Sequence, residues 1–240
     1  MSPVLSLHRV SKRYGGITAV NDVSFTVQRG QFLGLMGANG AGKTTLFSLI
    51  AGNQRLTRGD IQLHGQSISG KRPDEICGLG VARTFQIVRP FRDMTVFENA
   101  YTAALFKQKA GAEQARERAL QTLMSTGLEH VQDTLAGDLT LSGQKRLELA
   151  RALATGGDLL LLDEIMAGLT PSEVEAMLEM LRRIHLERGL TIICVEHVMR
   201  ALMRLSDEII VLHHGVMMAR GRPEEIAQNP DVIRNYFGND

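Results

Sequence analysis

The stretch Gly37–Thr45 constrains the fold most strongly, because it fits the pattern G-x-x-x-x-G-K-[ST] of a phosphate-binding P-loop. The apolar run 32–36 predicts a buried strand before the loop, and the run 46–51 predicts the start of a helix after it. These flanks make an accidental glycine-rich turn the weaker alternative. Backbone N–H groups can surround phosphate oxygens here, Lys43 can reach the β- and γ-phosphates, and Thr44 can ligate Mg²⁺. The candidate nucleotide-binding residues of the loop are Gly37, Asn39, Gly40, Ala41, Gly42, Lys43, Thr44 and Thr45.

Length and composition limit the possible fold classes and partners of the chain. With 240 residues, 44% of them hydrophobic, it can bury a full core as one large α/β domain. Lys+Arg 27 against Asp+Glu 26 gives a net charge of +1, so nucleic acid is not the expected partner. Apolar runs such as 159–162 are far shorter than the roughly 20 residues of a membrane helix. Neither a signal peptide nor a C-x-x-C pair is evident, and Cys77 and Cys194 form no disulfide framework, so a cytoplasmic location is expected.

Before the P-loop, alternating segments at 4–10 and 23–27 flank a Gly15-Gly16 turn and predict an antiparallel hairpin. Tyr14 directly precedes the turn, where it could fold back and stack on a nucleotide base. On spacing alone, a half-exposed packing role is an equal alternative for this residue. After the P-loop helix, the stretch 59–65 predicts another strand and turn.

A helical insertion divides the two halves of the α/β pattern. The stretch 80–86 predicts a strand that ends at Gln86, which could reach the γ-phosphate or its metal, although a solvated loop residue is the commoner alternative. Residues 96–127 are helical in composition, and Gly111 marks a connection between two helices. A further amphipathic helix is predicted at 144–153.

Two later strands end in polar side chains. The apolar strand 158–164 ends at Asp163 and Glu164, which point in different directions because strand residues alternate faces. In a P-loop enzyme such an Asp holds Mg²⁺ through its water shell, and a neighbouring Glu can polarise the attacking water. The alternative is a plain acidic end to a strand. The strand 191–195 is followed by Glu196 and His197, and this His could contact the γ-phosphate or simply be a packing residue.

The remainder continues the pattern. Pro171 opens a long helix at 174–187, a hairpin follows at 209–212 and 216–219, and 223–236 is predicted to be a helical tail.

The order of these signals resembles, across nearly the whole chain, the ATP-binding subunits of ABC transporters. The signals are Tyr14, the P-loop, Gln86, a signature-like segment before Arg151, Asp163-Glu164 and His197. Three further segments, 82–86, 91–99 and 223–234, resemble the ATPases of branched-chain (hydrophobic) amino-acid importers. Urea and amide importers share these segments and remain an alternative.

The resemblance implies a single α/β ABC ATPase domain over 1–240. Residues 1–86 and 156–240 would form the P-loop NTPase core with an antiparallel β subdomain, and 87–155 an inserted α-helical subdomain that carries the signature. The implied cofactors are ATP and Mg²⁺. The implied roles are adenine stacking by Tyr14, contact with Mg²⁺ and the lytic water by Gln86, metal ligation by Thr44 and Asp163, general-base catalysis by Glu164 and γ-phosphate sensing by His197.

The resemblance also implies partners. Two ATPase subunits would sandwich two ATP molecules, with each site completed by the signature of the other subunit. The pair would drive two integral membrane permease subunits from the inner face of the cell membrane. An extracytoplasmic solute-binding protein would take part indirectly.

The signature departs from the family pattern. Counted back from Arg151 without a gap, L-S-G-G-Q falls on residues 139–143. Thr140 keeps a hydroxyl, but Leu141 and Ser142 replace both glycines, and these would be strained if the backbone needed a positive φ. Thr140, Ser142 and Gly143 are then the candidate contacts with the ATP of the partner. A gapped alignment on 141–144 keeps more letters but shortens the link to the helix.

Two more departures follow Glu164. Ile165 replaces the usual Pro, and Thr170 replaces an acidic residue or Asn in the loop that comes after it. A pairing with a different ATPase subunit and two unequal sites is therefore expected, with a homodimer as the alternative. A non-transport ABC ATPase acting on DNA or ribosomes and a regulatory subunit with little turnover would carry many of the same motifs. The near-zero net charge disfavours the former, and the intact Asp163, Glu164 and His197 disfavour the latter.

Overall fold

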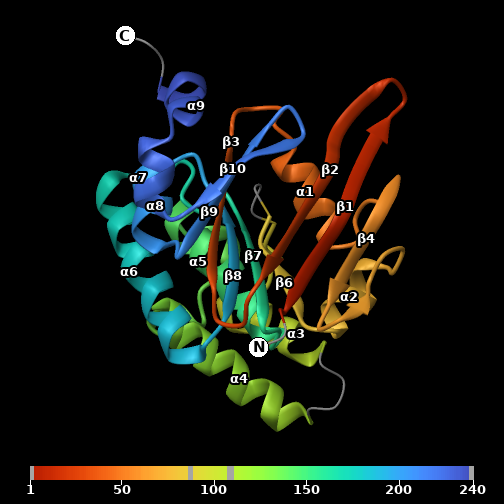
Figure 1. Ribbon diagram of the computed structural model, residues 1–240. Helices are drawn as coiled ribbons and strands as arrows, with labels where there is room; N and C mark the ends of the chain where they lie inside the picture. Colours follow the sequence, from red (N-terminus) through yellow and green to blue (C-terminus); the bar gives the residue numbers. More distant parts are fainter. Residues whose placement is uncertain (1–2, 86–88, 107–110, 238–240) are drawn as a thin grey trace.

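Two β-sheets and a set of covering helices make up the chain in the computed structural model, which describes residues 3–85, 89–106 and 111–237 (Figure 1). Within these residues, a six-stranded sheet stands at the centre, and a four-stranded sheet lies beside it. The helices α6, α7 and α8 lie on the outer side of the central sheet, and α3 and α4 lie at one end of the molecule (Figure 1).

The central sheet consists of parallel strands except at one edge. Its order is β10 (Val216–Gly221), β9 (Glu208–His213), β3 (Phe32–Gly37), β8 (Thr191–Val195), β7 (Leu159–Asp163) and β6 (Val81–Arg83). Only β10 runs antiparallel to its neighbour, as the second arm of a hairpin around Gly215. Every residue of β3, β7 and β8 is buried, as expected for parallel strands covered on both faces.

The four-stranded sheet is antiparallel and forms the β subdomain. Its order is β2 (Ile17–Val27), β1 (Leu5–Tyr14), β4 (Arg58–Leu63) and β5 (Gln66–Ser67). The β1–β2 turn lies at Gly15-Gly16, as predicted, but the hairpin is longer than the alternating segments suggested. Register shifts around Val10 and Lys12 carry the pairing as far as Tyr14, which lies opposite Ile17.

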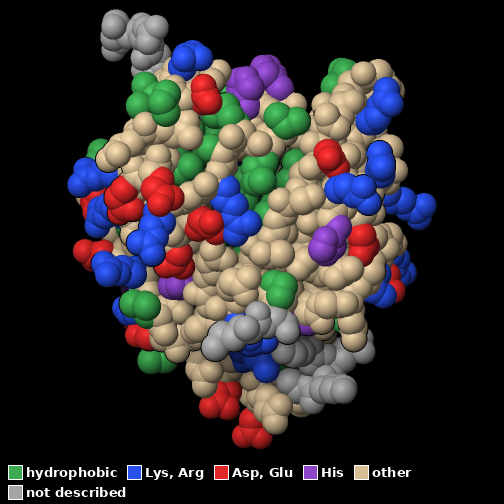
Figure 2. All heavy atoms as spheres, viewed as in Figure 1, with side chains coloured by type: hydrophobic (Ala, Val, Ile, Leu, Met, Phe, Trp, Pro, Cys, Tyr) green, Lys and Arg blue, Asp and Glu red, His purple; other side chains and the backbone are tan. Residues whose placement is uncertain are grey.

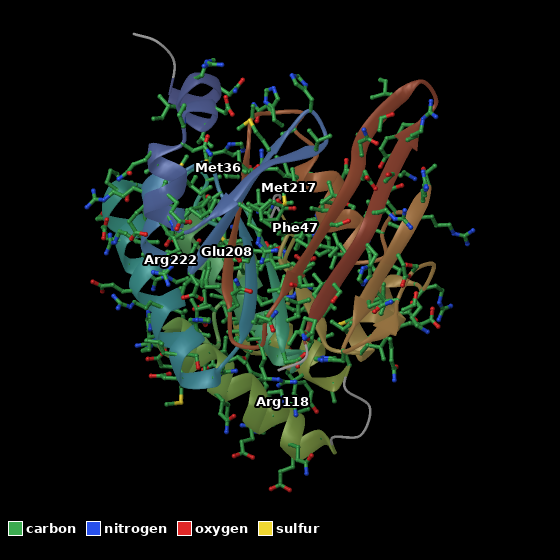
Figure 3. All side chains as sticks on the ribbon, in the orientation of Figure 1. Met36, Phe47, Arg118, Glu208, Met217 and Arg222 are labelled. Atoms are coloured by element: carbon green, nitrogen blue, oxygen red, sulfur yellow. The ribbon has the colours of Figure 1, made fainter. Side chains whose placement is uncertain are left out.

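Helices fill the space between and around the sheets. Helix α1 (Lys43–Ile50) packs between the two sheets, where its Phe47 is fully buried (Figure 3). The opposite face of the central sheet is covered by α5 (Leu141–Ala154), α6 (Pro171–Arg188), α7 (Met199–Leu205) and α8 (Pro223–Gln228). The insertion is built from α3 (Val96–Leu105) and α4 (Ala112–Thr126), which pack with α5 around a separate small core, with 3₁₀ turns at Glu129–Val131 and Ala136–Asp138.

The predicted fold class, a P-loop α/β core with an antiparallel β subdomain and an inserted helical subdomain, is confirmed. Three local features differ from the sequence-based description. A short helix α2 (Pro73–Gly78) was missed, although Pro73 in its first turn followed by Asp74 and Glu75 is a helix-start signal. The strand before Gln86 is only three residues long.

The third concerns the predicted C-terminal helix, which is interrupted. The Asn229 side chain accepts hydrogen bonds from the next turn and starts α9 (Pro230–Val232), with a π-helical turn at Ile233–Phe237.

Charges on the face shown in Figure 2 are mixed, with acidic and basic side chains interspersed over α6, α7 and α8. Among the described residues, no helix is long and apolar enough to cross a membrane.

Candidate functional site

Three parallel strands bring the predicted site residues to one edge of the central sheet. Leu35 of β3 and Asp163 of β7 both pair with Val195 of β8, so the three strands end together. The P-loop, the Asp163-Glu164 pair and His197 follow directly from those ends. Ligands bind at this edge, beyond the carboxyl ends of the strands, in open α/β sheets.

The P-loop glycines are required by the local backbone. Gly40 and Gly42 have φ values of 80° and 103°, in the left-handed region that favours glycine. A Cβ on Gly37 would lie 2.7 Å from the carbonyl oxygen of Leu212, and one on Gly42 would overlap the carbonyl oxygen of Ala19. Since α1 begins at Lys43 directly after Gly42, its first N–H groups adjoin the loop and favour an anion there.

Lys43 is almost fully buried at the centre of the site. Its Nζ donates hydrogen bonds to the carbonyl oxygens of Gly37, at 2.5 Å, and Ala38, at 3.1 Å. Burial lowers the pKa of Lys43, while the nearby charges of Glu164 and Asp163 oppose that shift. The lysine therefore lies within electrostatic reach of both carboxylates as well as of the loop.

Asp163 has one oxygen paired and one oxygen without a partner. Its Oδ2 accepts a hydrogen bond from Nη2 of Arg83 at 2.8 Å; the Asp163 side chain is buried and that of Arg83 is partly buried. Its Oδ1 is buried and has no hydrogen-bond partner among the described residues. Thr44 and Asp163 line the same cavity of about 700 Å³, so a hydroxyl and a carboxylate face one space.

This donor set fits Mg²⁺, which prefers oxygen ligands and completes its shell with water and phosphate oxygens. In the described part of the chain, no group of three or more His, Cys, Asp or Glu could hold a metal without such help.

Glu164 and His197 are in direct contact. Oε1 of Glu164 lies 2.8 Å from Nε2 of His197. A carboxylate only accepts hydrogen bonds, so this contact is a hydrogen bond in the tautomer of His197 that carries its proton on Nε2. Glu164 is 7% exposed and has a φ of 51°, in the left-handed region, whereas the His197 side chain is 46% exposed. The Glu164 carboxylate thus contacts His197 and also lies close enough to influence the charge of Lys43 in the P-loop.

The structure leaves two predicted residues untested. Tyr14 lies at the end of β1 with 43% of its surface exposed, and Nζ of Lys12 lies 4.7 Å from its ring centroid. Its hairpin reaches the P-loop through Ala19, which approaches Gly42 closely. Gln86 lies outside the described residues.

The signature segment forms the N-terminus of α5. Thr140 precedes the helix, and its Oγ1 accepts a hydrogen bond from the N–H of Gly143 at 3.2 Å. Ser142 is buried and Leu141 is 46% exposed. Neither of them has a positive φ, so the conditional expectation of backbone strain at these positions does not apply.

Sequence reasoning missed three charged residues around the site. Arg83 pairs with Asp163, Lys145 donates a hydrogen bond to the carbonyl oxygen of Glu164, and the Glu196 carboxylate accepts one from the N–H of Met166. Arg83 in a short, otherwise apolar strand was an available signal. Lys145 lies in a helix of mixed polarity, where nothing in the sequence separates it from a surface residue.

Comparisons with known proteins agree with this arrangement. Residues 20–167 match the family model described as ABC transporter. The chain is 38% identical over 250 residues to the high-affinity branched-chain amino acid transport ATP-binding protein LivG of Salmonella typhimurium, with 98% of each chain covered.

Two solved structures have similar folds. MJ1267, an ATP-binding cassette of an ABC transporter, superimposes with a TM-score of 0.89 at 26% identity over 99% of this chain and 100% of its own. The dimeric cassette MJ0796, bound to ADP and Pi, has a TM-score of 0.81 at 25% identity over 91% of this chain and 98% of its own. The predicted family is confirmed, and this chain belongs to the ABC transporter family.

Proposed function

We propose that this protein is the ATP-binding and ATP-hydrolysing subunit of an ABC importer for branched-chain or other hydrophobic amino acids. The contact of Glu164 with His197 beside the P-loop carries the proposal, because a carboxylate oriented by an imidazole next to a phosphate-binding loop is suited to activating water. The solute class is supported by the full-length similarity to LivG.

In this mechanism the P-loop binds the ATP phosphates through its N–H groups and Lys43. Thr44 and Asp163 would hold Mg²⁺, which, when bound, neutralises charge on the β- and γ-phosphate oxygens. The Glu164 carboxylate accepts a proton from water as the water oxygen attacks the γ-phosphorus, and the bond to the bridging β–γ oxygen breaks. His197 keeps the carboxylate oriented, and the products are ADP and inorganic phosphate.

Each ATP site would be completed by a second subunit, and we propose that this subunit is a different ATPase chain. In the family pattern the signature meets the ATP bound by the opposite subunit. Here the exposed Leu141 presents an apolar side chain at that helix N-terminus, and Ser142 adds a Cβ that a glycine lacks. Both features disfavour close approach of a polyanion, which makes the site completed by this chain the weaker one.

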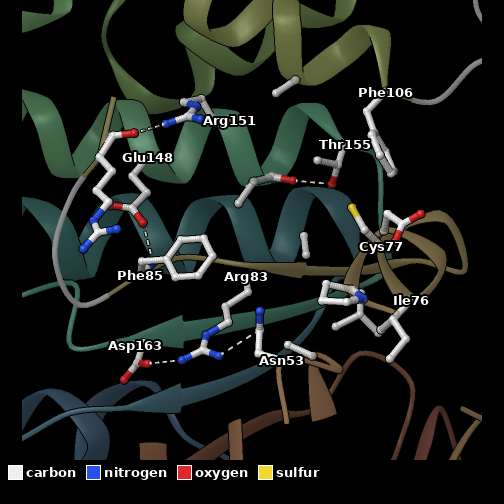
Figure 4. Close-up of a pocket in the computed structure, with 18 of the residues that line it drawn as sticks. Asn53, Ile76, Cys77, Arg83, Phe85, Phe106, Glu148, Arg151, Thr155 and Asp163 are labelled. Atoms are coloured by element: carbon white, nitrogen blue, oxygen red, sulfur yellow. Dashed lines mark hydrogen bonds and ion pairs between the residues drawn. The ribbon is translucent and has the colours of Figure 1, made fainter. Parts of the chain in front are cut away.

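The membrane subunits would dock at the large cavity between the central sheet and the inserted helices (Figure 4). It reaches from Asp163 at one end to Cys77 and Phe106 at the other. Arg83 also lines the cavity and pairs with Asp163, so a segment bound there could contact a residue that contacts the proposed metal ligand. Its lining is mostly apolar, with Phe85 and Phe106 among the apolar residues, and it carries basic side chains (Arg83, Arg89, Arg151) beside acidic ones (Asp74, Glu148, Asp163). This surface fits a cytoplasmic segment of a permease, with the subunit peripheral on the inner membrane face.

The loop from Gln86 to Asp93 is proposed to shift with nucleotide state when that partner is bound. Its described part is tied to α5, because Nη1 of Arg151 donates to the carbonyl oxygen of Arg89 at 2.9 Å. Hydrogen exchange in the assembled complex, with and without ATP, tests this, and unchanged protection of the loop would contradict it.

Uptake by the reconstituted transporter tests the function itself. Proteoliposomes that contain ATP should accumulate labelled leucine when the binding protein is outside, and Glu164→Gln should abolish most of that uptake. Co-purification with nucleic acid in place of multi-span membrane proteins, or leucine uptake unaffected by Glu164→Gln, would contradict the proposal.

A further inference from the structure

Two charged side chains are buried behind the catalytic turn and take no part in binding the P-loop. Lys145 of α5 is 4% exposed, and Glu196, directly after β8, is 3% exposed. They come from different layers of the molecule, since α5 belongs to the helical side and β8 to the central sheet. Burying charges is costly unless they are paired and hydrogen-bonded, so their contacts need an explanation.

Both side chains contact the backbone of one short turn, Glu164–Ala167. Nζ of Lys145 donates to the carbonyl oxygen of Glu164 at 3.0 Å. Oε1 of Glu196 accepts from the N–H of Met166 at 2.9 Å. The two charges therefore hold the turn at its first and third residues.

Backbone hydrogen bonds and the burial of its side chains also hold the turn. The N–H of Glu164 donates to the carbonyl oxygen of Val195 at 2.9 Å, and the N–H of Ala167 donates back to the carbonyl oxygen of Glu164 at 3.2 Å. The φ of 51° at Glu164 is unfavourable for a residue with a side chain and persists only where its surroundings enforce it. Ile165 contributes a buried apolar side chain but, unlike a proline, leaves its own φ free.

We propose that Lys145 and Glu196 are positioning residues that hold the turn after Glu164 in its strained conformation and thereby aim the Glu164 carboxylate at the attacking water. We call this pair the turn clamp. The inference rests on the proposed function, because it takes Glu164 as the general base.

Electrostatics support the geometry. The charge of Glu196 is the strongest influence opposing the burial-induced lowering of the Lys145 pKa, followed by Glu148 and Glu164. Burial raises the pKa of Glu196 to about 7, and this rise is opposed first by the hydrogen bond from the Met166 N–H and then by the Lys145 charge. Each partner thus favours the charged form of the other, although both side chains are almost fully buried.

The direct test measures ATP hydrolysis by the assembled complex, with the catalytic Glu of the partner ATPase inactivated. Lys145→Met should lower kcat about tenfold to a hundredfold, as expected for a misplaced catalytic group, and leave the affinity for ATP within about twofold. Lys145→Arg, which keeps a charged donor, should recover most of the rate. Lys71→Met, the same change at an exposed lysine, should match the wild type.

Variants of Glu196 provide a second test, which stays informative even if Lys145→Met does not fold. Glu196→Gln keeps an oxygen that can accept from Met166, so it should retain more activity than Glu196→Ala. Amide exchange at Met166 should quicken in Glu196→Ala but not in the exposed control Glu113→Gln.

Three results would overturn the turn clamp: wild-type kcat in Lys145→Met, no recovery in Lys145→Arg, or unchanged Met166 exchange in Glu196→Ala. Including Glu164→Gln in the same assay separates the two levels of inference. If Glu164→Gln is inactive while Lys145→Met is normal, the clamp fails and the function stands. If Glu164→Gln is fully active, the proposed role of Glu164 fails, whatever the exchange experiment gives.

Discussion

Nε2 of His197 lies 2.8 Å from Oε1 of Glu164, which connects a residue that follows β8 to the residue directly after β7. The two are 33 positions apart in the chain and meet only because β7 and β8 are neighbours in the central sheet. The contact fixes the orientation of a carboxylate on a strained turn beside the P-loop.

Tyr14 is predicted to stack on the adenine ring. Tyr14→Ala should weaken ATP binding by about 1–3 kcal/mol, the scale of base stacking on an aromatic side chain, and Tyr14→Phe should bind nearly normally. Calorimetric titration with ATP measures the effect. Inorganic triphosphate, which lacks the base, is the control ligand, and an equal loss for both ligands would rule out stacking.

The ion pair of Arg83 with Asp163 is predicted to matter for folding. Arg83→Met removes the ion-pair partner of the buried Asp163 carboxylate and should lower the free energy of unfolding by about 3–5 kcal/mol. Arg72→Met removes an exposed pair with Asp74 and should change it by less than about 1 kcal/mol. Urea unfolding of the two variants checks the difference, and equal effects would show that burial does not set the cost.

Glu196 is predicted to make stability depend on pH. Burial raises its pKa from 4.5 to about 7, so the folded state retains the proton to a higher pH than the unfolded state. The stability contributed by Glu196 is thus fully present below pH 4.5 and is lost as the pH rises through about 7. Relative to Glu196→Gln, the wild type should lose on the order of 2–3 kcal/mol across that window.

Urea unfolding at a series of pH values measures this difference. It reports Glu196 together with its electrostatic coupling to the charged or titratable neighbours Lys145, Glu164 and Cys194. Glu113→Gln is the exposed control. A difference between wild type and Glu196→Gln that stays constant from pH 4.5 to 7 would contradict the assignment.

Glycines in the signature are predicted to improve the opposite site. Leu141→Gly with Ser142→Gly removes the side chains that hinder approach of the partner's ATP, so turnover at the partner's P-loop should rise while that at Lys43 stays unchanged. Because no positive φ is involved, the gain comes from access alone. Single-site turnover, with each P-loop inactivated in turn, measures it. Loss of activity in the double variant, or a fully active homodimer of this chain, would contradict the proposed asymmetry.

The P-loop and the strand ends could be predicted because each is a local signal. The pattern at Gly37–Thr45 has fixed spacing, and Asp163 and Val195 end apolar runs that are buried on both faces of a sheet. The contact between Glu164 and His197 follows once β7 and β8 are known to be neighbours. Their order in the sheet is set by tertiary packing, which no short motif encodes.

The buried charges could not be predicted for a related reason. Lys145 and Glu196 are 51 positions apart; Lys145 lies between the polar residues Gln144 and Arg146, and Glu196 lies at the polar end of a strand, before His197. Their burial depends on how α5 packs against the central sheet. The positive φ of Glu164 could not be predicted either. A glutamate gives no sign of a left-handed backbone, because this conformation is imposed by the surrounding structure.

The role of Glu164 as general base is the central claim, and single-turnover hydrolysis of ATP tests it most directly. In the assembled complex, with the other site inactivated, Glu164→Gln should bind ATP as the wild type does and hydrolyse it about 10²-fold or more slowly. Lys43→Ala should instead lose nucleotide binding itself. Hydrolysis by Glu164→Gln at the wild-type rate would contradict the account, because the water would then be activated by some other group.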